Sequence, residues 1–388
     1  VVDDFESYND ITAGEEGSNL VYMTWIDGYD NPLANGSTIG YVEAYQPSME
    51  TDIVHGGKQS VPLIYDNSVA AYSEATRTFA VPQDWTEAGV QTLALYFHGT
   101  AGNTGQLYVK VNGSKVVYDG DAGNLALAGW QACNIDLASF GVSLQSVTTL
   151  AIGIDGNGAS GTLYFDNIRL YARSREFITP AEPSSAGLIG HWKFDGDTLD
   201  YSGLGNDGTA GGNPTFVAGK VGSNAIELDG DDYVVIDAVA DDFTDNDITL
   251  SAWVKTTDSG ADWFSCNTSG RDNVVRFVIQ DTKAAFDTDD EHALSNTAVN
   301  DDQWHLLTFV RSGNTGYVYV DGVMENSYAA TFSFSSNNLW SIGQEWDSGG
   351  PSGFLTGIVD DARIYDYALS LGEVAWLAGR TEPFDKPF

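Results

Sequence analysis

Two acidic motifs near the ends of the two halves of the chain carry the clearest candidate chemistry. Residues 164–171 read YFDNIRLY and residues 358–365 read IVDDARIY, so each segment places an Asp three positions before an Arg. Each half also opens with acids, in the motifs DDFE and WKFD. Carboxylate oxygens are ligands that hard divalent cations prefer. We therefore predict one divalent cation per half, held by Glu6 and Asp166 in the first and by Asp195 and Asp360 in the second.

The oxygen donors around these acids favour calcium. Calcium takes six to eight oxygens without strict geometry, and Asp, Asn and the carbonyls of Gly-rich loops supply them. The further candidate ligands are Asp4 in the first half and Asp200, Asn206 and Asp229 in the second. Two alternatives stay open. Asp and Asn are common in turns because their side chains imitate turn hydrogen bonds, and the acids of the first half could instead pair with Arg169 or Arg173.

A second set of candidates consists of aromatic residues next to Gly, Asp or Asn. An aromatic ring stacks on the apolar face of a sugar, while nearby polar side chains bind its hydroxyls. The candidates for glycan binding are Trp25, Tyr29 and Trp85 in the first half, and Trp263, Trp340 and Trp346 in the second. The alternative for each of them is packing in the core or at its rim.

Catalytic patterns are missing from the sequence. Glucanases need a cluster such as E-x-D-x-E, which sets two carboxylates about 5 Å apart, and Glu345-Trp-Asp347 lacks the third acid. Residues 347–351 read DSGGP, as in the nucleophile segment of trypsin-type proteases, but none of the five His residues has the flanks of the required base. G-x-S-x-G, H-E-x-x-H and a phosphate loop are also absent. We therefore predict a protein without enzymatic activity.

The charge balance excludes several partners. The 388 residues include 17 Lys and Arg against 55 Asp and Glu, a formal net charge of -38, so nucleic acid and anionic lipid would be repelled. No apolar run approaches the roughly 18 residues of a spanning helix, and we expect no membrane insertion. The two cysteines, Cys133 and Cys266, fall in different halves. We predict buried thiols, with an interchain bridge as the alternative.

Strand patterns dominate the chain. Short alternating runs recur between Gly, Asn and Asp clusters, as in residues 106–113 (QLYVKVNG) and 316–322 (GYVYVDG), which is typical of hairpins. Only residues 370–378 keep a helical period, and they begin with a capping-box pattern. We predict an all-β fold of two tandem antiparallel jelly-roll β-sandwich domains. In such sandwiches the first and last strands can lie side by side, which would bring the paired acids together.

A Pro-containing, polar stretch divides the chain. Residues 174–186 break the strand rhythm and are predicted to form a short linker. The first domain then spans residues 1–173 and the second spans residues 187–378. Residues 379–388 carry two further prolines, and we predict an extended C-terminal tail.

Several motifs follow one another through the second domain. They are WKFD (192–195), DYSG (200–203), AIELDG (225–230), LSAWV (250–254), YVDG (319–322) and IVDDARIY (358–365). In this order they resemble the laminin-G-like jelly-roll domains of bacterial surface and secreted proteins, relatives of the concanavalin A-like lectin and glucanase sandwich. The resemblance implies a jelly roll with bound calcium in an extracellular protein.

The first domain resembles a second family more loosely. Phe5-Glu6 near its start and Tyr164-Phe-Asp-Asn167 near its end are similar to motifs of the galactose-binding-like sandwiches found among carbohydrate-binding modules. In that family an early acid and a late Asp hold structural calcium. The resemblance therefore implies the same role for Glu6 and Asp166.

Together these patterns predict a non-catalytic, calcium-stabilised protein, secreted to the cell surface, that binds glycans. The alternative is a structural subunit that assembles with copies of itself into an extracellular filament or layer through its extended termini. Secretion is inferred from composition and family, and we expect Val1 to follow a removed signal peptide or an artificial start. Three sequons, at Asn35, Asn112 and Asn267, permit glycosylation, although chance explains them equally well.

Overall fold

The computed structural model describes residues 1–42, 46–243, 246–288 and 292–388. It divides the chain into two compact units. The first unit is Val1–Thr179 together with Glu382–Phe388, and the second is Pro180–Thr381. Among the described residues, no helix combines the length and the apolar character needed to cross a membrane.

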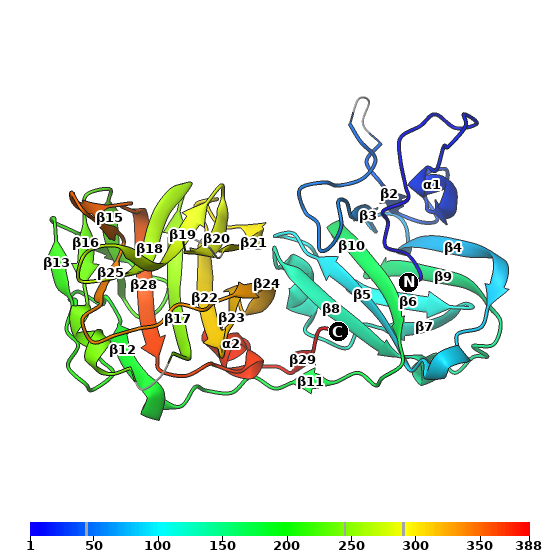
Figure 1. Ribbon diagram of the computed structural model, residues 1–388. Helices are drawn as coiled ribbons and strands as arrows, with labels where there is room; N and C mark the ends of the chain where they lie inside the picture. Colours follow the sequence, from blue (N-terminus) through cyan, green and yellow to red (C-terminus); the bar gives the residue numbers. More distant parts are fainter. Residues whose placement is uncertain (43–45, 244–245, 289–291) are drawn as a thin grey trace. The chain divides into compact units, whose positions relative to one another are not determined.

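The first unit is a sandwich of two five-stranded antiparallel sheets (Figure 1). In order, the first sheet consists of β1 (Trp25–Ile26), β4 (Tyr72–Gln83), β9 (Val147–Asp155), β6 (Gln106–Val111) and β7 (Ser114–Val117). The second sheet consists of β2 (Ser37–Ile39), β3 (Val61–Asp66), β10 (Ser160–Tyr171), β5 (Thr92–His98) and β8 (Trp130–Asp136). On β5, Leu93, Leu95 and Phe97 belong to the core. The alternating Tyr96 and His98 therefore face away from the core.

Short helical turns connect these strands. They are α1 (Val21–Thr24), η1 (Glu87–Gly89), η2 (Ala122–Ala126) and η3 (Leu137–Phe140). Asp121 and Asp136 cap η2 and η3 by accepting hydrogen bonds from backbone N–H groups, which satisfies donors that a helix start leaves free.

The second unit is a larger sandwich (Figure 1). One sheet has the order β14 (Thr215–Ala218), β15 (Asn224–Asp229), β28 (Thr356–Tyr365), β17 (Ile248–Thr256), β22 (Trp304–Ser312), β23 (Thr315–Val320) and β24 (Val323–Ala329), and β12 (Leu188–Trp192) also pairs with β28. The other has the order β13 (Thr209–Gly211), β16 (Tyr233–Val235), β25 (Leu339–Ile342), β18 (Gly260–Asn267), β19 (Asn273–Gln280), β20 (Lys283–Asp287) and β21 (His292–Ala298). A hairpin of β26 (Glu345–Asp347) and β27 (Gly350–Ser352), the turns η4 (Ser185–Gly187) and η5 (Asp237–Asp241), and α2 (Leu371–Leu377) complete the unit.

The predicted fold class is confirmed, because the chain forms antiparallel β-sandwiches and little helix. The predicted helix is α2, and Ser370 and Glu373 form the expected capping box. Cys133 and Cys266 are buried free thiols, as predicted. Each is surrounded by its own core, which raises the pKa of both thiols.

The C-terminal tail packs against the first unit, which the sequence did not predict. Within it, β29 (Phe384–Asp385) pairs with β11 (Phe177–Ile178). The buried Asp385 carboxylate accepts a hydrogen bond from the backbone N–H of Asn134 and pairs with Arg175 at 2.8 Å. The segment that the assembly hypothesis would lend to a neighbour is therefore bound by its own chain.

We predict that Asp385→Ala lowers the free energy of unfolding of the first unit by about 2–3 kcal/mol. The variant leaves buried hydrogen-bond donors of Arg175 and Asn134 without their charged acceptor. Urea denaturation measures the effect. Glu176→Gln is the matched control, because Glu176 forms an exposed pair with Lys386 of the same tail, and such a pair contributes at most about 1 kcal/mol. Equal losses in the two variants would contradict the role of Asp385.

Candidate functional site

A β-bulge carries the predicted metal-binding Asp in the last strand of each unit. On β10, Asp166 is followed by Asn167 with φ 53°, and on β28, Asp360 is followed by Asp361 with φ 48°. Asn and Asp adopt this left-handed backbone more readily than most residues, and a bulge redirects neighbouring side chains. Asp166 and Asp360 are both fully buried. Asp361 instead pairs with His191 and Arg363.

A Phe with left-handed backbone precedes the partner acid in each unit. Phe5 has φ 59° and Phe194 has φ 54°, and both rings are buried in the core. This conformation costs about 1–3 kcal/mol in a residue other than glycine, and the burial of a Phe side chain offsets a cost of that size. Glu6 directly follows Phe5, and Asp195 directly follows Phe194. Each acid therefore comes after a Phe with the same left-handed backbone conformation.

In the first unit, both acids bind one loop, residues 55–59. Asp166 Oδ2 accepts hydrogen bonds from the backbone N–H groups of His55 and Gly56, at 3.1 and 3.0 Å. Glu6 Oε1 accepts hydrogen bonds from those of Lys58 and Gln59, at 2.9 and 3.2 Å. The loop therefore joins the start of the unit to its last strand. Asp4 belongs to the same region, since its carboxylate accepts a hydrogen bond from the backbone N–H of Glu6.

The second unit repeats this arrangement with residues 220–224. Asp360 Oδ2 accepts hydrogen bonds from the N–H groups of Lys220 and Val221, at 2.7 and 2.8 Å. Asp195 Oδ1 accepts hydrogen bonds from those of Ser223 and Asn224, at 2.6 and 2.9 Å. The structure thus brings the predicted pair Asp195 and Asp360 to one loop, as it does Glu6 and Asp166.

A glycine lies at the middle of each loop. Gly57 has φ 86° and Gly222 has φ 69°, a conformation that favours glycine. A Cβ at Gly57 would lie 2.3 Å from Glu6 Oε1, and one at Gly222 would lie 2.5 Å from Asp195 Oδ2. The two loops, HGGKQ and KVGSN, share little besides this glycine, and sequence analysis did not identify them.

The electrostatics of these acids suit a cation. Burial raises the pKa of Asp166 to about 7, with a further contribution from Glu6. Burial also raises the pKa of Asp360 to about 6. Asp360 Oδ1 is buried and accepts no hydrogen bond. A cation beside these carboxylates would favour their ionised forms and satisfy the unpaired oxygen.

The other predicted ligands of the second unit have different partners. Asp200 accepts hydrogen bonds from the backbone N–H groups of His191, Ser202, Gly205 and Asn206. Burial raises its pKa, but the hydrogen bonds from Ser202, His191 and Asn206 outweigh burial and lower it. Asn206 donates to the carbonyl of Ile189 and to the carboxylate of Asp242. Asp200 therefore organises its own turn, as the turn alternative describes, whereas Asn206 links that turn to β12 and to the end of η5.

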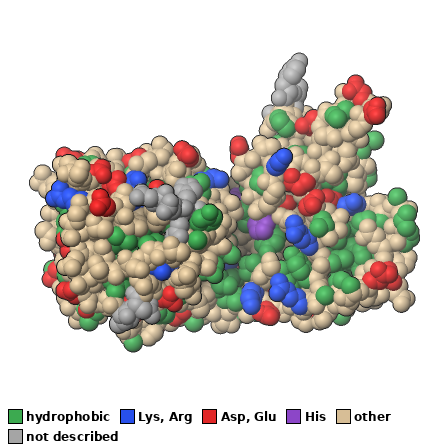
Figure 2. Space-filling model, viewed as in Figure 1, with side chains coloured by type: hydrophobic (Ala, Val, Ile, Leu, Met, Phe, Trp, Pro, Cys, Tyr) green, Lys and Arg blue, Asp and Glu red, His purple; other side chains and the backbone are tan. Residues whose placement is uncertain are grey.

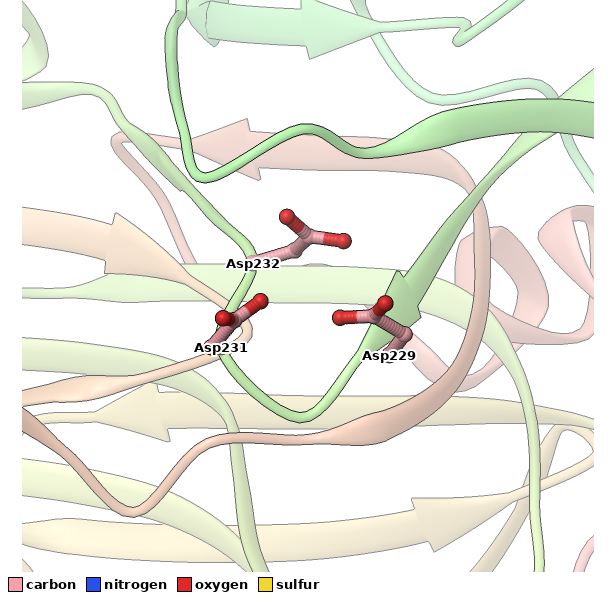
Figure 3. Close-up of side chains that lie close together, drawn as sticks. All are labelled: Asp229, Asp231 and Asp232. Atoms are coloured by element: carbon pink, nitrogen blue, oxygen red, sulfur yellow. The ribbon is translucent and has the colours of Figure 1, made fainter.

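Asp229 belongs to a separate acidic loop. It lies at the end of β15, and Asp231 and Asp232 follow it in the loop toward β16 (Figure 3). Carboxylate oxygens of the three acids lie within 4.8 Å of one another, a spacing that could hold a metal ion. Asp229 and Asp231 are exposed, whereas Asp232 is buried. The loop leads directly into Tyr233.

Four of the six predicted glycan-binding aromatics lie in the core, so the prediction for them is wrong. Trp25, Trp85, Trp263 and Trp340 are each at most 2% exposed. Trp25, Trp263 and Trp340 are strand residues, and burial of such large apolar surfaces outweighs the polar character of their sequence neighbours. Tyr29 is 62% exposed.

Trp346 is the remaining candidate, and it stands among other partly exposed side chains. Its ring packs edge-on against Tyr233, at 5.9 Å, and Tyr233 contacts Phe354 at 6.1 Å. The Arg271 guanidinium lies 4.9 Å from the Trp346 ring. All four side chains are partly exposed. We call these four residues the Trp346 patch.

The backbone below the Trp346 patch is fixed from β18. The side chain of Asn267, which is 0% exposed, donates to the carbonyl of Trp346 at 3.1 Å and accepts from its N–H at 3.3 Å. Next to it, Arg276 donates two hydrogen bonds to the buried Asp262 carboxylate and lies 3.2 Å from Glu345 Oε2. Burial raises the pKa of both acids, and Arg276 opposes that shift.

The side chains of all three sequon asparagines are used inside the fold. Asn35 binds Glu74 and Ser37, Asn112 binds residues 146–149, and Asn267 binds Trp346. In all three, the Nδ2 atom that would carry a glycan already donates a hydrogen bond within the fold. This arrangement favours the chance interpretation of the sequons.

Several solved structures resemble parts of the chain. Domain 4 of AbnA, a GH43 extracellular arabinanase from Geobacillus stearothermophilus solved with arabinotriose, is 22% identical over 49% of this chain and 98% of that one, with a TM-score of 0.41. The binding domain of Paraclostridial Mosquitocidal Protein 1 is 15% identical over 50% of this chain and 52% of that one, also with a TM-score of 0.41. The heptameric SAP-like pentraxin from Limulus polyphemus is 21% identical over 34% of this chain and 70% of that one, with a TM-score of 0.31. No curated protein matches.

A family model matches the second unit. The match covers residues 228–375, which include β16, β18, β25 and the β26–β27 hairpin, and thus the whole Trp346 patch. The galactose-binding-like resemblance of residues 1–173 lies outside this match and stays a prediction. Residues 228–375 match the model of the Laminin_G_3 family, which belongs to the concanavalin A-like lectin/glucanases superfamily.

Proposed function

We propose that the protein is a non-catalytic glycan-binding protein, and that its second unit holds the saccharide at the Trp346 patch. The observation that carries the proposal is the partly exposed Trp346 ring, grouped with Tyr233 and Phe354 and held through its backbone by Asn267. An aromatic surface offers its apolar face to a pyranose. The family match to a superfamily named for lectins and glucanases supports the same proposal.

Polar groups beside the rings would bind the sugar hydroxyls. The Arg271 guanidinium offers donors, and Asp347, on the strand that carries Trp346, offers an exposed carboxylate. The hydrogen bonds from Asn267 fix the backbone of β26 before a ligand binds. Less conformational entropy is therefore lost on binding. Asn267 therefore acts as a positioning residue for the patch.

The acids beneath the patch support a binding role over catalysis. A glycosidase needs one carboxylic acid that donates a proton and one carboxylate that attacks or activates water. Here Asp262 and Glu345 both face Arg276, and Asp262 is fully buried. Arg276 holds these two carboxyl groups in one structural ion cluster.

We also propose one calcium ion in each unit, held by Glu6 and Asp166 in the first and by Asp195 and Asp360 in the second. The repeated loop geometry and the unpaired Asp360 Oδ1 support this. Bound calcium would neutralise acids in a chain whose formal charge is -38. A calcium-dependent, acidic glycan-binding protein suits the outside of the cell, and we propose secretion to the cell surface.

Trp346→Ala is predicted to weaken glycan binding at least about tenfold, because it removes the stacking surface. A glycan array followed by titration of the best ligand measures the change. Tyr328→Ala is the matched control, since Tyr328 is a 52% exposed aromatic of the same unit outside the patch. The proposal fails if no glycan of a broad panel binds, or if both variants bind as the unmodified protein does.

Calcium is predicted to raise the melting temperature by several degrees, as expected for a ligand well above its dissociation constant. Asp360→Asn should remove the shift of the second unit and leave that of the first, and Asp166→Asn should do the reverse. Differential scanning calorimetry with calcium and with chelator measures the shifts. Glu182→Gln is the control, because Glu182 is an exposed acid in the predicted linker segment of the sequence. Identical melting with and without calcium would contradict both sites.

In chelator, stability is predicted to fall as the pH rises from about 4 to about 7. The folded-state pKa values of Asp166 and Asp360, about 7 and about 6, lie above those of an unfolded Asp. The folded state therefore holds protons that the unfolded state has released, and folding is disfavoured progressively across this range. Urea denaturation at several pH values should show a smaller fall in the Asp166→Asn, Asp360→Asn double variant. If stability falls equally in the double variant and in the unmodified protein, the pH dependence comes from other groups.

A further inference from the structure

A pocket in the first unit takes no part in the glycan binding proposed above, although the proposed calcium ligand Glu6 lines it. Its volume is about 240 Å3, and it lies where β5 and β10 meet the 55–57 loop and the tail. The lining residues used below are Asp4, His55, Tyr96, Arg169, Tyr171 and Phe388. The pocket belongs wholly to the first unit. It is therefore independent of the Trp346 patch.

Aromatic rings line the pocket. Tyr171 and Phe388 stack face to face, with ring centroids 4.2 Å apart and an angle of 7°. His55 stacks on the buried Tyr96 at 3.6 Å. Tyr171 and Phe388 are both partly exposed, so the uncovered part of this ring stack offers a ligand an apolar contact.

Two guanidinium groups give this region its positive charge. Arg169 donates a hydrogen bond to the amide oxygen of Asn167, but its Nε is buried and has no partner. The Arg173 guanidinium lies 4.6 Å from the Phe388 ring. Burial lowers the pKa of His55 to about 4, so His55 adds no charge at neutral pH. On the face of the first unit that Figure 2 shows, Lys and Arg side chains lie among Asp and Glu side chains.

The charge of Arg169 stands out in this chain. Acids outnumber Lys and Arg by 55 to 17, yet within the part of the chain that the structure describes, Arg169 makes no ion pair with a carboxylate. Its nearest polar partner is the neutral amide of Asn167. A buried, unpaired N–H of a charged group is costly. An anionic ligand group in the pocket would pair with the charge of the same guanidinium.

Asp4 also lines the pocket. It is not one of the proposed calcium ligands, and its charge would repel a small, fully charged anion such as phosphate. The same carboxylate accepts hydrogen bonds from hydroxyl groups. The lining therefore combines a ring surface, acceptors for hydroxyls and a guanidinium for one negative charge.

We propose that this pocket binds an acidic saccharide, a sugar ring that carries a carboxylate. The carboxylate pairs with Arg169, the hydroxyls donate to Asp4, and the apolar ring face packs against the Tyr171–Phe388 ring stack. The first unit thus selects charged residues of a polysaccharide, and it does so without the Trp346 patch.

Isothermal titration of the full chain with oligosaccharides of glucuronic, galacturonic and mannuronic acid tests the proposal, with their neutral counterparts and methyl esters as comparison. At least one acidic oligosaccharide should bind at least about tenfold more tightly than its neutral and esterified forms. The preference should weaken as salt is added, because the pairing is electrostatic. Arg169→Gln should abolish the preference, whereas Trp346→Ala should leave it intact.

Arg173→Gln provides a second variant if Arg169→Gln melts early. Arg173 is exposed, so its loss should spare the fold and reduce the preference for acidic ligands by a smaller factor. Equal affinity for acidic and neutral oligosaccharides would overturn the proposal, as would an unchanged preference in folded Arg169→Gln. Loss of the preference in Trp346→Ala alone would assign acidic binding to the second unit. That outcome would overturn the proposed pocket and leave the proposed function standing.

Discussion

The burial of one Asp in the last strand of each sandwich is the constraint on which both units depend. Asp166 and Asp360 are removed from solvent, and a buried carboxylate needs hydrogen bonds or a cation. Each obtains two backbone N–H donors from a glycine-centred loop, and the same loop binds Glu6 or Asp195 near the start of the unit. In each unit, the first segment, the loop and the last strand are therefore joined around one acidic centre. Phe5 and Phe194, which have positive φ, directly precede the early acids of these centres.

Residues with a local signature were predicted well. The capping box of α2 depends on Ser370 and Glu373, three positions apart, and it forms as expected. The alternating patterns along the chain predicted two sandwiches. The similar first and last segments of the two halves predicted that Asp166 lies near Glu6 and that Asp360 lies near Asp195. The loops at 55–59 and 220–224 were missed because their contribution is backbone N–H groups, which any residue supplies, and a single glycine. The tail was missed because the partner of Asp385 is Arg175, 210 positions away.

The aromatic residues show where local reasoning fails. A Trp beside Gly, Asp or Asn suggested a loop, yet Trp263 and Trp340 occupy strands and fill the core of the second unit. Their burial depends on neighbours from distant strands, which no local pattern reveals. Trp346 differs because it lies on a short hairpin that Asn267 holds from β18, and this leaves its ring partly exposed. A surface of this kind, within residues that match a family model of the concanavalin A-like superfamily, is the basis of the proposal that the second unit binds glycans.

A crystal structure with calcium and a bound oligosaccharide tests this account most directly. The oligosaccharide should be the ligand that the unmodified protein retains best on a glycan array. The account predicts electron density for a sugar ring against Trp346, with Tyr233, Phe354 and Arg271 around it. Density for the sugar elsewhere on the second unit, with the Trp346 patch covered only by water, would contradict it.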